Sequence, residues 1–327
     1  MKEYIVNLKN RILDNKKITF EEAQKLMNIS SDDTETLEVL YSSANEIREK
    51  FCGDFFDLCT IINAKSGKCS EDCKYCAQSA HFKTNVECYN LVTPEHALEE
   101  AKKVEKEGAH RFSLVTSGRG LKKGDKEIAD LKAIYEKLND ETTLSLCASH
   151  GICNEDVLQE LFDSGVRSYH HNLETSREYY PEICTSHTYE ERIDTIKAAQ
   201  KVGFRVCSGG IWGLGEEEID RLKLAFELQA LDVKSVPINI LMPIPGTPFE
   251  KLPPLNPVDI LKMLAIYRFV LPKASIRYAG GRSKLQGLEE KGIRCGVNSA
   301  LTGNFLTTTG STIESDKEMV KRNGYKI

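Results

Sequence analysis

The stretch FDLCTIINAKSGKCSEDCKYC, residues 56–76, joins a short apolar segment to a polar loop that contains three cysteines. Residues 56–62 are mostly apolar and β-branched, which is typical of a buried β-strand. Comparable segments recur along the chain at 111–116, 144–148, 166–174, 204–210, 235–241, 275–280 and 297–303. We therefore predict eight β-strands, the first of which ends just before the cysteine loop.

Segments with helical signals lie between the predicted strands. One begins at Thr93-Pro94 and ends at Gly108, and another begins with Thr188 and Glu191 at the spacing of a capping box. Strands that alternate with helices favour a parallel sheet, and eight of them predict an α/β fold of the (β/α)8 TIM-type barrel class. A doubly wound open sheet is the alternative, because hydrophobic periodicity does not show whether a sheet closes.

The first 50 residues have helical patterns without strands. Thr19 and Glu22 form a second capping-box signature, and Leu37, Leu40 and Ala44 recur at helical spacing. We predict an N-terminal helical extension over residues 1–50, followed by one barrel domain over residues 51–327.

Net charge, apolar runs and the number of cysteines argue against some classes of function for this chain and favour others. The 327 residues carry a net charge of −5, so nothing indicates a nucleic-acid-binding surface. The N-terminus has no apolar signal core and no run of about 18 apolar residues occurs, so we expect a cytoplasmic protein without a membrane partner. Eleven cysteines in such a chain favour metal or redox chemistry over a disulfide framework.

The loop after the first strand places Cys69, Cys73 and Cys76 at C-x3-C-x2-C spacing. In a barrel this loop lies on the catalytic face. One interpretation is a zinc site with His81 as the fourth ligand, but structural zinc sites usually have paired C-x2-C ligands. A [4Fe–4S] cluster fits better, because three thiolates hold three irons and leave the fourth iron open.

This loop, with Tyr75 just before its last cysteine, resembles the signature of radical S-adenosylmethionine (SAM) enzymes. The stretches HHNLETS, HTYEERIDT, VCSGGIWGLGE, SVPIN and LTTTG extend a resemblance to the biotin synthase family over nearly the whole chain. The resemblance implies a homodimeric barrel enzyme with a flavodoxin- or ferredoxin-type electron donor. It also implies that SAM, cleaved at the open iron, yields a radical that starts sulfur insertion into dethiobiotin.

The resemblance also implies roles for individual residues. The SAM contacts are Tyr75, Thr116, Ser117, Asn172, Glu174 and Arg192. The dethiobiotin contacts are His170, Asn172, Asn239, Thr307 and Thr308. Two positions depart from the family pattern, because Glu174 stands where Asp is more common and His170 stands where Asn is usual. The departure at His170 leaves its contact with dethiobiotin open.

In this family an auxiliary iron–sulfur cluster, usually [2Fe–2S], donates the sulfur and is held by three strand cysteines and an arginine. Cys147, Cys207 and Arg277 match three of these ligands, but Ser113 stands where the remaining cysteine is expected. A serine hydroxyl is a harder and less acidic ligand than a thiol. We hypothesise that Cys59, on the neighbouring first strand, replaces it, so that the cluster is [2Fe–2S] or a variant. The alternative is that Cys59 is a buried small apolar residue.

Cys184 and Cys295 are further candidate ligands, whereas Cys52, Cys88 and Cys153 are expected to be structural. Two rival functions stay open at this point. One is another radical reaction on the same scaffold, as in the hydrogenase-maturation and methylornithine-forming relatives, and the other is a non-catalytic zinc- or cluster-binding module.

Overall fold

The computed structural model describes residues 1–303 and 311–327. Its centre is a parallel sheet in the order β5-β4-β3-β2-β1-β9-β8-β7-β6, and a further pairing of β5 with β7 closes the ring. The strands are β1 (Asp57–Lys65), β2 (Arg111–Thr116), β3 (Ser145–Ser149), β4 (Ser168–His170), β5 (Arg205–Cys207), β6 (Gly210–Trp212), β7 (Ser235–Ile240), β8 (Ser275–Tyr278) and β9 (Ser299–Leu301). The predicted barrel is confirmed, and the open doubly wound alternative is wrong because the sheet closes.

The fifth predicted strand is divided in the structure. β5 and β6 both pair with β7, and Ser208 and Gly209 separate them. A Cβ atom at Gly209 would lie 1.9 Å from the carbonyl oxygen of Pro237, so only glycine fits this approach of two backbones. The two short strands therefore fill one position of the eight-position barrel.

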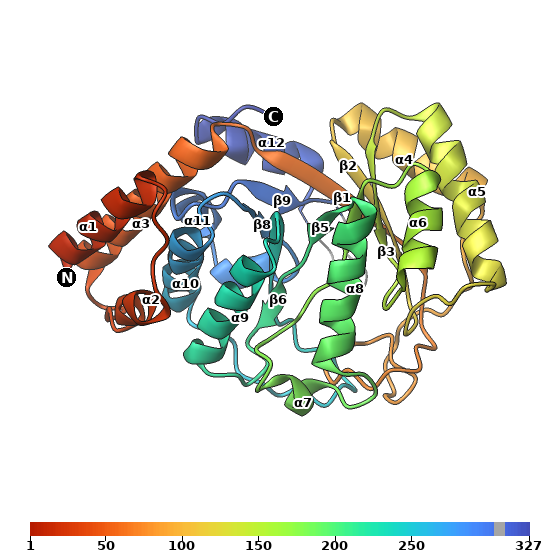
Figure 1. Ribbon diagram of the computed structural model, residues 1–327, viewed down its shortest axis with the longest axis horizontal. Helices are drawn as coiled ribbons and strands as arrows, with labels where there is room; N and C mark the ends of the chain where they lie inside the picture. The colour runs from red at the N-terminus through yellow and green to blue at the C-terminus, as the bar shows by residue number, and fades with distance from the viewer. Residues whose placement is uncertain (304–310) are drawn as a thin grey trace.

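Helices cover the outside of the barrel (Figure 1). They are α4 (Pro94–Glu107), α5 (Lys126–Glu141), α6 (Glu155–Asp163), α7 (Tyr180–Ile183), α8 (Tyr189–Val202), α9 (Glu218–Ala230), α10 (Pro257–Val270), the 3-10 turn η1 (Arg282–Leu285), α11 (Glu289–Arg294) and α12 (Ile313–Arg322). The predicted start signals are confirmed: Thr93 accepts a hydrogen bond from the His96 amide, and Thr188 and Glu191 form a complete capping box. In the described parts of the chain, no helix is long and apolar enough to cross a membrane.

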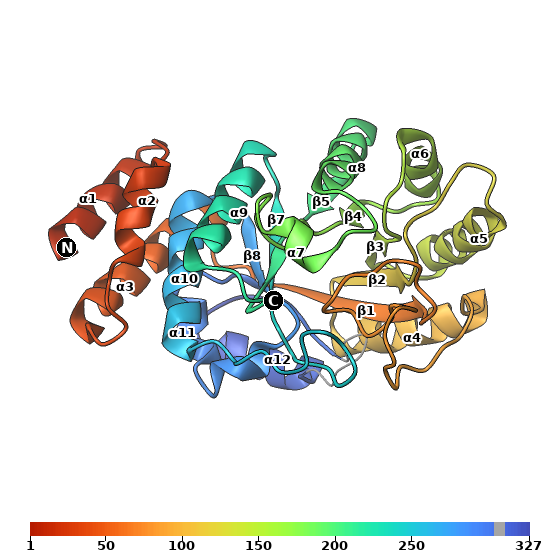
Figure 2. The ribbon, with the colours of Figure 1, turned by 90° about the horizontal axis from the view of Figure 1, so that it is seen from below.

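The N-terminal extension consists of α1 (Lys2–Leu13), α2 (Phe20–Met27) and α3 (Thr34–Cys52). Figures 1 and 2 show these helices at one end of the molecule, next to α10. α10 has buried residues on all its faces because it lies between the barrel and the extension. Lys262 of α10 donates hydrogen bonds to the carbonyls of Met27 and Ile29 at 3.2 and 3.4 Å. The predicted boundary at residue 50 falls in the last turn of α3.

The barrel interior has a polar base below an open cavity. At the base Arg111 bonds to Asp57, Ser145 and Ser168, and Arg205 donates to Ser275. Side chains two residues further along a strand lie on the same face and one layer nearer its carboxyl end. This alternation places the thiols of Cys59 and Cys147 in the layer directly above the base.

Candidate active site

A cavity of about 420 Å³ opens at the carboxyl ends of the strands. Its wall includes the three cysteines of the predicted cluster loop, Cys69, Cys73 and Cys76. His170 and Arg277, which belong to the barrel interior, line the same cavity. The structure therefore brings together two predicted sites that are far apart in the sequence, and we call them the rim site and the interior site.

Backbone hydrogen bonds fold the rim loop onto itself. The amide of Cys69 donates to the carbonyl of Gln78, and the amide of Ala80 donates to the carbonyl of Cys69. Lys68 enters the loop with a positive φ of 52°. Asp72 fixes the loop to the segment after α7, because its carboxylate accepts from the amides of Thr185 and Ser186 at 2.9 and 3.0 Å. The chain thus holds three neighbouring thiols against one end of the cavity.

Two of the rim thiols, Cys73 and Cys76, are hard to ionise without a cation beside them. A hydrogen bond with Cys184 and burial both raise the pKa of Cys73, and burial raises the pKa of Cys76 to about 11. A coordinated metal deprotonates such thiols outright. Three soft sulfur donors on a shared wall fit an iron–sulfur cluster with one iron left open toward the cavity.

A second group of potential ligands lies beside the rim site. The Sγ atoms of Cys184 and Cys73 are 3.7 Å apart, and Cys184 Sγ is 3.3 Å from His187 Nδ1. His187 also bonds to Glu71 at 2.6 Å. The sequence marked Cys184 as a candidate but missed His187, although its C-x2-H spacing from Cys184 was available as a signal.

The predicted SAM contacts gather at the rim end of the cavity. Tyr75, Thr116, Ser117, Asn172, Glu174 and Arg192 all line it. Ser117 donates to the carbonyl of Gly67 at 2.7 Å, which ties the end of β2 to the cluster loop. Arg192 donates to the Tyr180 hydroxyl at 2.5 Å and to the Asn172 carbonyl at 2.7 Å. The guanidinium is therefore held in place from several elements.

Glu174 has an unusual backbone and an unusual environment. Its φ of 70° lies in the left-handed region, which Asp and Asn adopt more readily than Glu. The side chain is buried, Oε2 has no hydrogen-bond partner among the described residues, and burial raises its pKa despite the nearby Arg192. A strained residue with a free buried acceptor is typical of a ligand-binding position.

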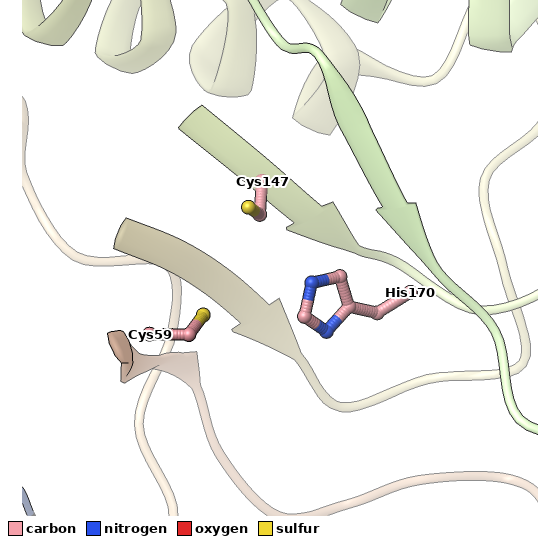
Figure 3. Close-up of side chains that lie close together, drawn as sticks. All are labelled: Cys59, Cys147 and His170. Carbon is pink, nitrogen blue, oxygen red and sulfur yellow. The ribbon is translucent and has the colours of Figure 1, made fainter. Parts of the chain in front are cut away.

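The interior site is centred on Cys59, Cys147 and His170. Their ligand atoms all lie within 4.8 Å of one another, and Figure 3 shows the three side chains facing a common space from three strands. Cys207 pairs in register with His170 and bonds to Ser235 at 3.3 Å. Burial lowers the pKa of His170, which favours the neutral imidazole. This donor set of thiols and imidazole suits iron.

Ser113 lies in register with Cys147 on the next strand. It is fully buried, and its Oγ has no hydrogen-bond partner in the described parts of the chain. The ligand atom of Cys59, from the strand on the other side of β2, lies within 4.8 Å of those of Cys147 and His170. Cys59 is therefore placed to share a metal ion with Cys147.

Arg277 reaches the interior site from β8 but is paired with the base of the barrel. Its Nη2 donates to Asp57 Oδ2 at 2.5 Å and its Nη1 donates to the carbonyl of Ala300 at 2.9 Å. Burial alone would raise the pKa of Asp57, but Arg277 and Arg111 outweigh it and lower that pKa to about 2. Sequence reasoning missed Asp57; its only signal was an acidic residue at the start of an otherwise apolar strand.

Two of the predicted substrate amides lie above the interior site. Asn172 Oδ1 accepts from the amide of Gly209 at 3.2 Å, and Asn239 Oδ1 accepts from the amide of Gly280 at 2.9 Å. Both side chains line the cavity. Thr307 and Thr308 lie outside the described residues, and the candidate Cys295 is buried beside Tyr41 and Tyr278, away from the cavity lining.

Comparison with known proteins agrees with this arrangement. Residues 64–228 match the Radical SAM superfamily, and residues 237–326 match the Biotin and Thiamin Synthesis associated domain. Biotin synthase of Fusobacterium nucleatum subsp. nucleatum is 60% identical over 100% of this chain and 91% of the relative. Biotin synthase of Clostridioides difficile is 51% identical over the full length of both chains.

Solved structures resemble the fold more distantly. Methylornithine synthase has a TM-score of 0.83 at 20% identity and covers 98% of this chain and 96% of its own. A maturase of the [FeFe]-hydrogenase has a TM-score of 0.84 at 16% identity, over 99% of this chain and 75% of its own. At such identities the likeness concerns the fold alone, whereas the sequence relatives share both halves of the barrel. The chain belongs to the biotin synthase family of the Radical SAM superfamily.

Proposed function

We propose that this chain forms biotin by inserting sulfur into dethiobiotin in a SAM-dependent radical reaction. One observation carries the proposal: a single cavity has three rim thiols at its mouth, and His170 and Arg277 of the interior site line its depth. When bound, the [4Fe–4S] cluster supplies the electron that cleaves SAM, and the auxiliary cluster supplies the sulfur. The two carbons that become bonded to sulfur carry no acidic proton. Acid–base catalysis therefore cannot begin the reaction, whereas a radical can.

Different residues of the cavity bind the rim cluster, SAM and dethiobiotin. Cys69, Cys73 and Cys76 hold the rim cluster, and Arg192 offers a guanidinium to the carboxylate of SAM. Tyr75, Thr116, Ser117, Asn172 and Glu174 complete the binding site for SAM. Asn172 and Asn239 present amide groups, which complement the ureido ring of dethiobiotin. Thr307 and Thr308 are proposed for its carboxylate by family resemblance, as are a homodimer and a flavodoxin- or ferredoxin-type donor.

We propose that Cys147 and Cys207 hold the auxiliary cluster at the positions expected from the family. Cys59 then replaces the ligand that is missing at Ser113. Cys59 Sγ lies within 4.8 Å of Cys147 Sγ, whereas the hydroxyl of Ser113 has no hydrogen-bond partner in the described residues and is a poor iron ligand. Replacing Cys59 with Ala should lower auxiliary iron and sulfide in anaerobically prepared protein, while Ser113→Ala should not. Unchanged iron in Cys59→Ala would refute the relocation of the ligand without touching the overall function.

The overall function is tested by anaerobic reconstitution with iron and sulfide, followed by incubation with SAM, a reductant and dethiobiotin. Biotin should form together with 5′-deoxyadenosine and methionine. Deoxyadenosine release without biotin would reject sulfur insertion and favour another radical reaction. A colourless preparation that contains zinc and no iron would reject radical chemistry altogether.

A further inference from the structure

His170 lies in the layer of the interior thiols, below the amides of Asn172 and Asn239. Its ligand nitrogen is within 4.8 Å of both Cys59 Sγ and Cys147 Sγ, and the ring projects into the space between the strands that carry them (Figure 3). Its partner in the strand register is Cys207, the third interior thiol. Thiols from β1 and β3 therefore lie close to one imidazole from β4, and Cys207 of β5 is its register partner on the next strand.

The buried histidines His150 and His187 have hydrogen-bond partners, whereas Nε2 of the buried His171 has none among the described residues. His150 bonds to Thr116 at 2.9 Å and to Tyr135 at 2.8 Å, and His187 bonds to Glu71 and Arg192 at 2.6 and 2.9 Å. Among the described residues, neither ring nitrogen of His170 has such a partner, and the thiols of Cys59 and Cys147 lie within 4.8 Å of its ligand nitrogen. The ring is partly buried and lines the cavity, so a ligand or an ion can reach it.

Arg277 is less available to a metal than His170. Both terminal nitrogens of the guanidinium donate hydrogen bonds, to Asp57 and to the carbonyl of Ala300. The ion pair with Asp57 favours the protonated guanidinium, which has no lone pair to give to iron. A neutral imidazole offers that lone pair and replaces thiolate in known iron–sulfur centres.

We propose that His170 is an iron ligand of the auxiliary cluster, which this chain holds with Cys59, Cys147, Cys207 and His170. Arg277 then acts as a positioning residue that neutralises Asp57 and contributes positive charge beside the cluster. This inference rests on the proposed function, because it assumes that an auxiliary cluster is present. Imidazole ligation makes the reduction potential of the cluster higher than that of an all-thiolate site.

The test uses the full-length holoprotein with ¹⁵N incorporated only in histidine. After one-electron reduction, pulsed electron paramagnetic resonance should detect a strongly coupled ¹⁵N nucleus. The coupling should vanish in His170→Asn and persist in His171→Asn, a matched control on the neighbouring residue. If His170→Asn loses its auxiliary iron, His170→Cys should restore the iron without the coupling and with a lower reduction potential.

The outcomes separate this inference from the proposed function. Auxiliary iron without strong histidine coupling in the unmodified protein would overturn ligation by His170 and leave sulfur insertion intact. A coupling that survives in His170→Asn would also overturn it, because another histidine would then be the ligand. Absence of auxiliary iron from the unmodified protein would overturn the proposed function, and this inference with it.

Discussion

The rim site and the interior site use the same soft ligands but are built in different ways. The three rim thiols come from eight consecutive positions of one loop, Cys69 to Cys76. The interior side chains come from β1, β3, β4, β5 and β8, which span more than 200 residues of the chain. The rim loop supplies all three of its own thiols, and Cys184 from another segment lies beside them. In the interior each ligand comes from a different strand, so a neighbouring strand can supply a replacement, as we propose for Cys59 and Ser113.

The two sites also differ in how their charges are balanced. At the rim Arg192 lies 3.8 Å from Glu174, whose second oxygen has no partner in the described residues, so polar capacity is left over for a ligand. In the interior one carboxylate, that of Asp57, binds both Arg277 and Arg111, so these guanidinium groups are paired within the protein. The rim is therefore arranged to receive a charged molecule, and the interior base is arranged to stabilise the fold.

The largest expected effect comes from breaking the rim site alone. Cys76→Ala should abolish the [4Fe–4S] cluster, and deoxyadenosine and biotin formation should both fall to background, because the loop then keeps only two of the three thiols that hold the cluster. Mössbauer spectra should still show the auxiliary iron. Residual SAM cleavage above background would mean that Cys184, beside Cys73, substitutes for a rim ligand.

Breaking the interior site should separate the two activities. Cys147→Ala should reduce auxiliary iron and lower biotin formation to background, while the rim residues continue to support SAM cleavage. Iron counting and simultaneous assay of deoxyadenosine and biotin measure the separation. Parallel loss of both products would show that the two sites depend on each other for folding.

The ion pairs of Asp57 with Arg277 and Arg111 should contribute strongly to the free energy of unfolding. Asp57→Asn leaves Arg277 and Arg111 buried without their carboxylate, so we expect a loss of roughly 3–5 kcal/mol in the free energy of unfolding. Asp54→Asn is the matched control, since its pair with Lys326 is exposed, and it should cost far less than Asp57→Asn. Urea denaturation of both variants provides the comparison, and equal losses would contradict it.

Low pH should weaken the ion pairs that Asp57 forms at the bottom of the barrel interior. The pKa of Asp57 is lowered from 3.8 to about 2, so its contribution is fully present above about pH 4 and is lost as the pH falls through 2. The stability difference between the unmodified protein and Asp57→Asn should shrink by roughly 2 kcal/mol over this interval. A difference that stays constant down to pH 2 would show that Asp57 is not stabilised as a carboxylate.

The smallest effect is expected at Ser113. Because its buried hydroxyl has no partner in the part of the chain that the structure describes, Ser113→Ala should change the free energy of unfolding by no more than about 1 kcal/mol, in the stabilising direction, and leave auxiliary iron unchanged. Thermal unfolding and iron analysis measure both quantities. A large loss of iron would return Ser113 to the ligand set and remove the reason for assigning Cys59.

The rim site was predictable because its information is local. C-x3-C-x2-C spacing after a strand places three thiols on one loop whatever the rest of the chain does, and the structure puts Cys69, Cys73 and Cys76 on one cavity wall. The alternation of strands and helices likewise predicted a parallel sheet. Interruption of the fifth strand at Gly209 was not predictable, because it depends on contact with the distant Pro237.

The sequence by itself determined the family, the order of strands and helices, and the thiols available to each site. Only the tertiary structure decided that the barrel closes, that Arg277 donates a hydrogen bond to Asp57, and that Cys59, Cys147 and His170 lie close together. The physical reason is that strand alternation fixes which side chains face inward, whereas their distances depend on the stagger of neighbouring strands around a closed barrel.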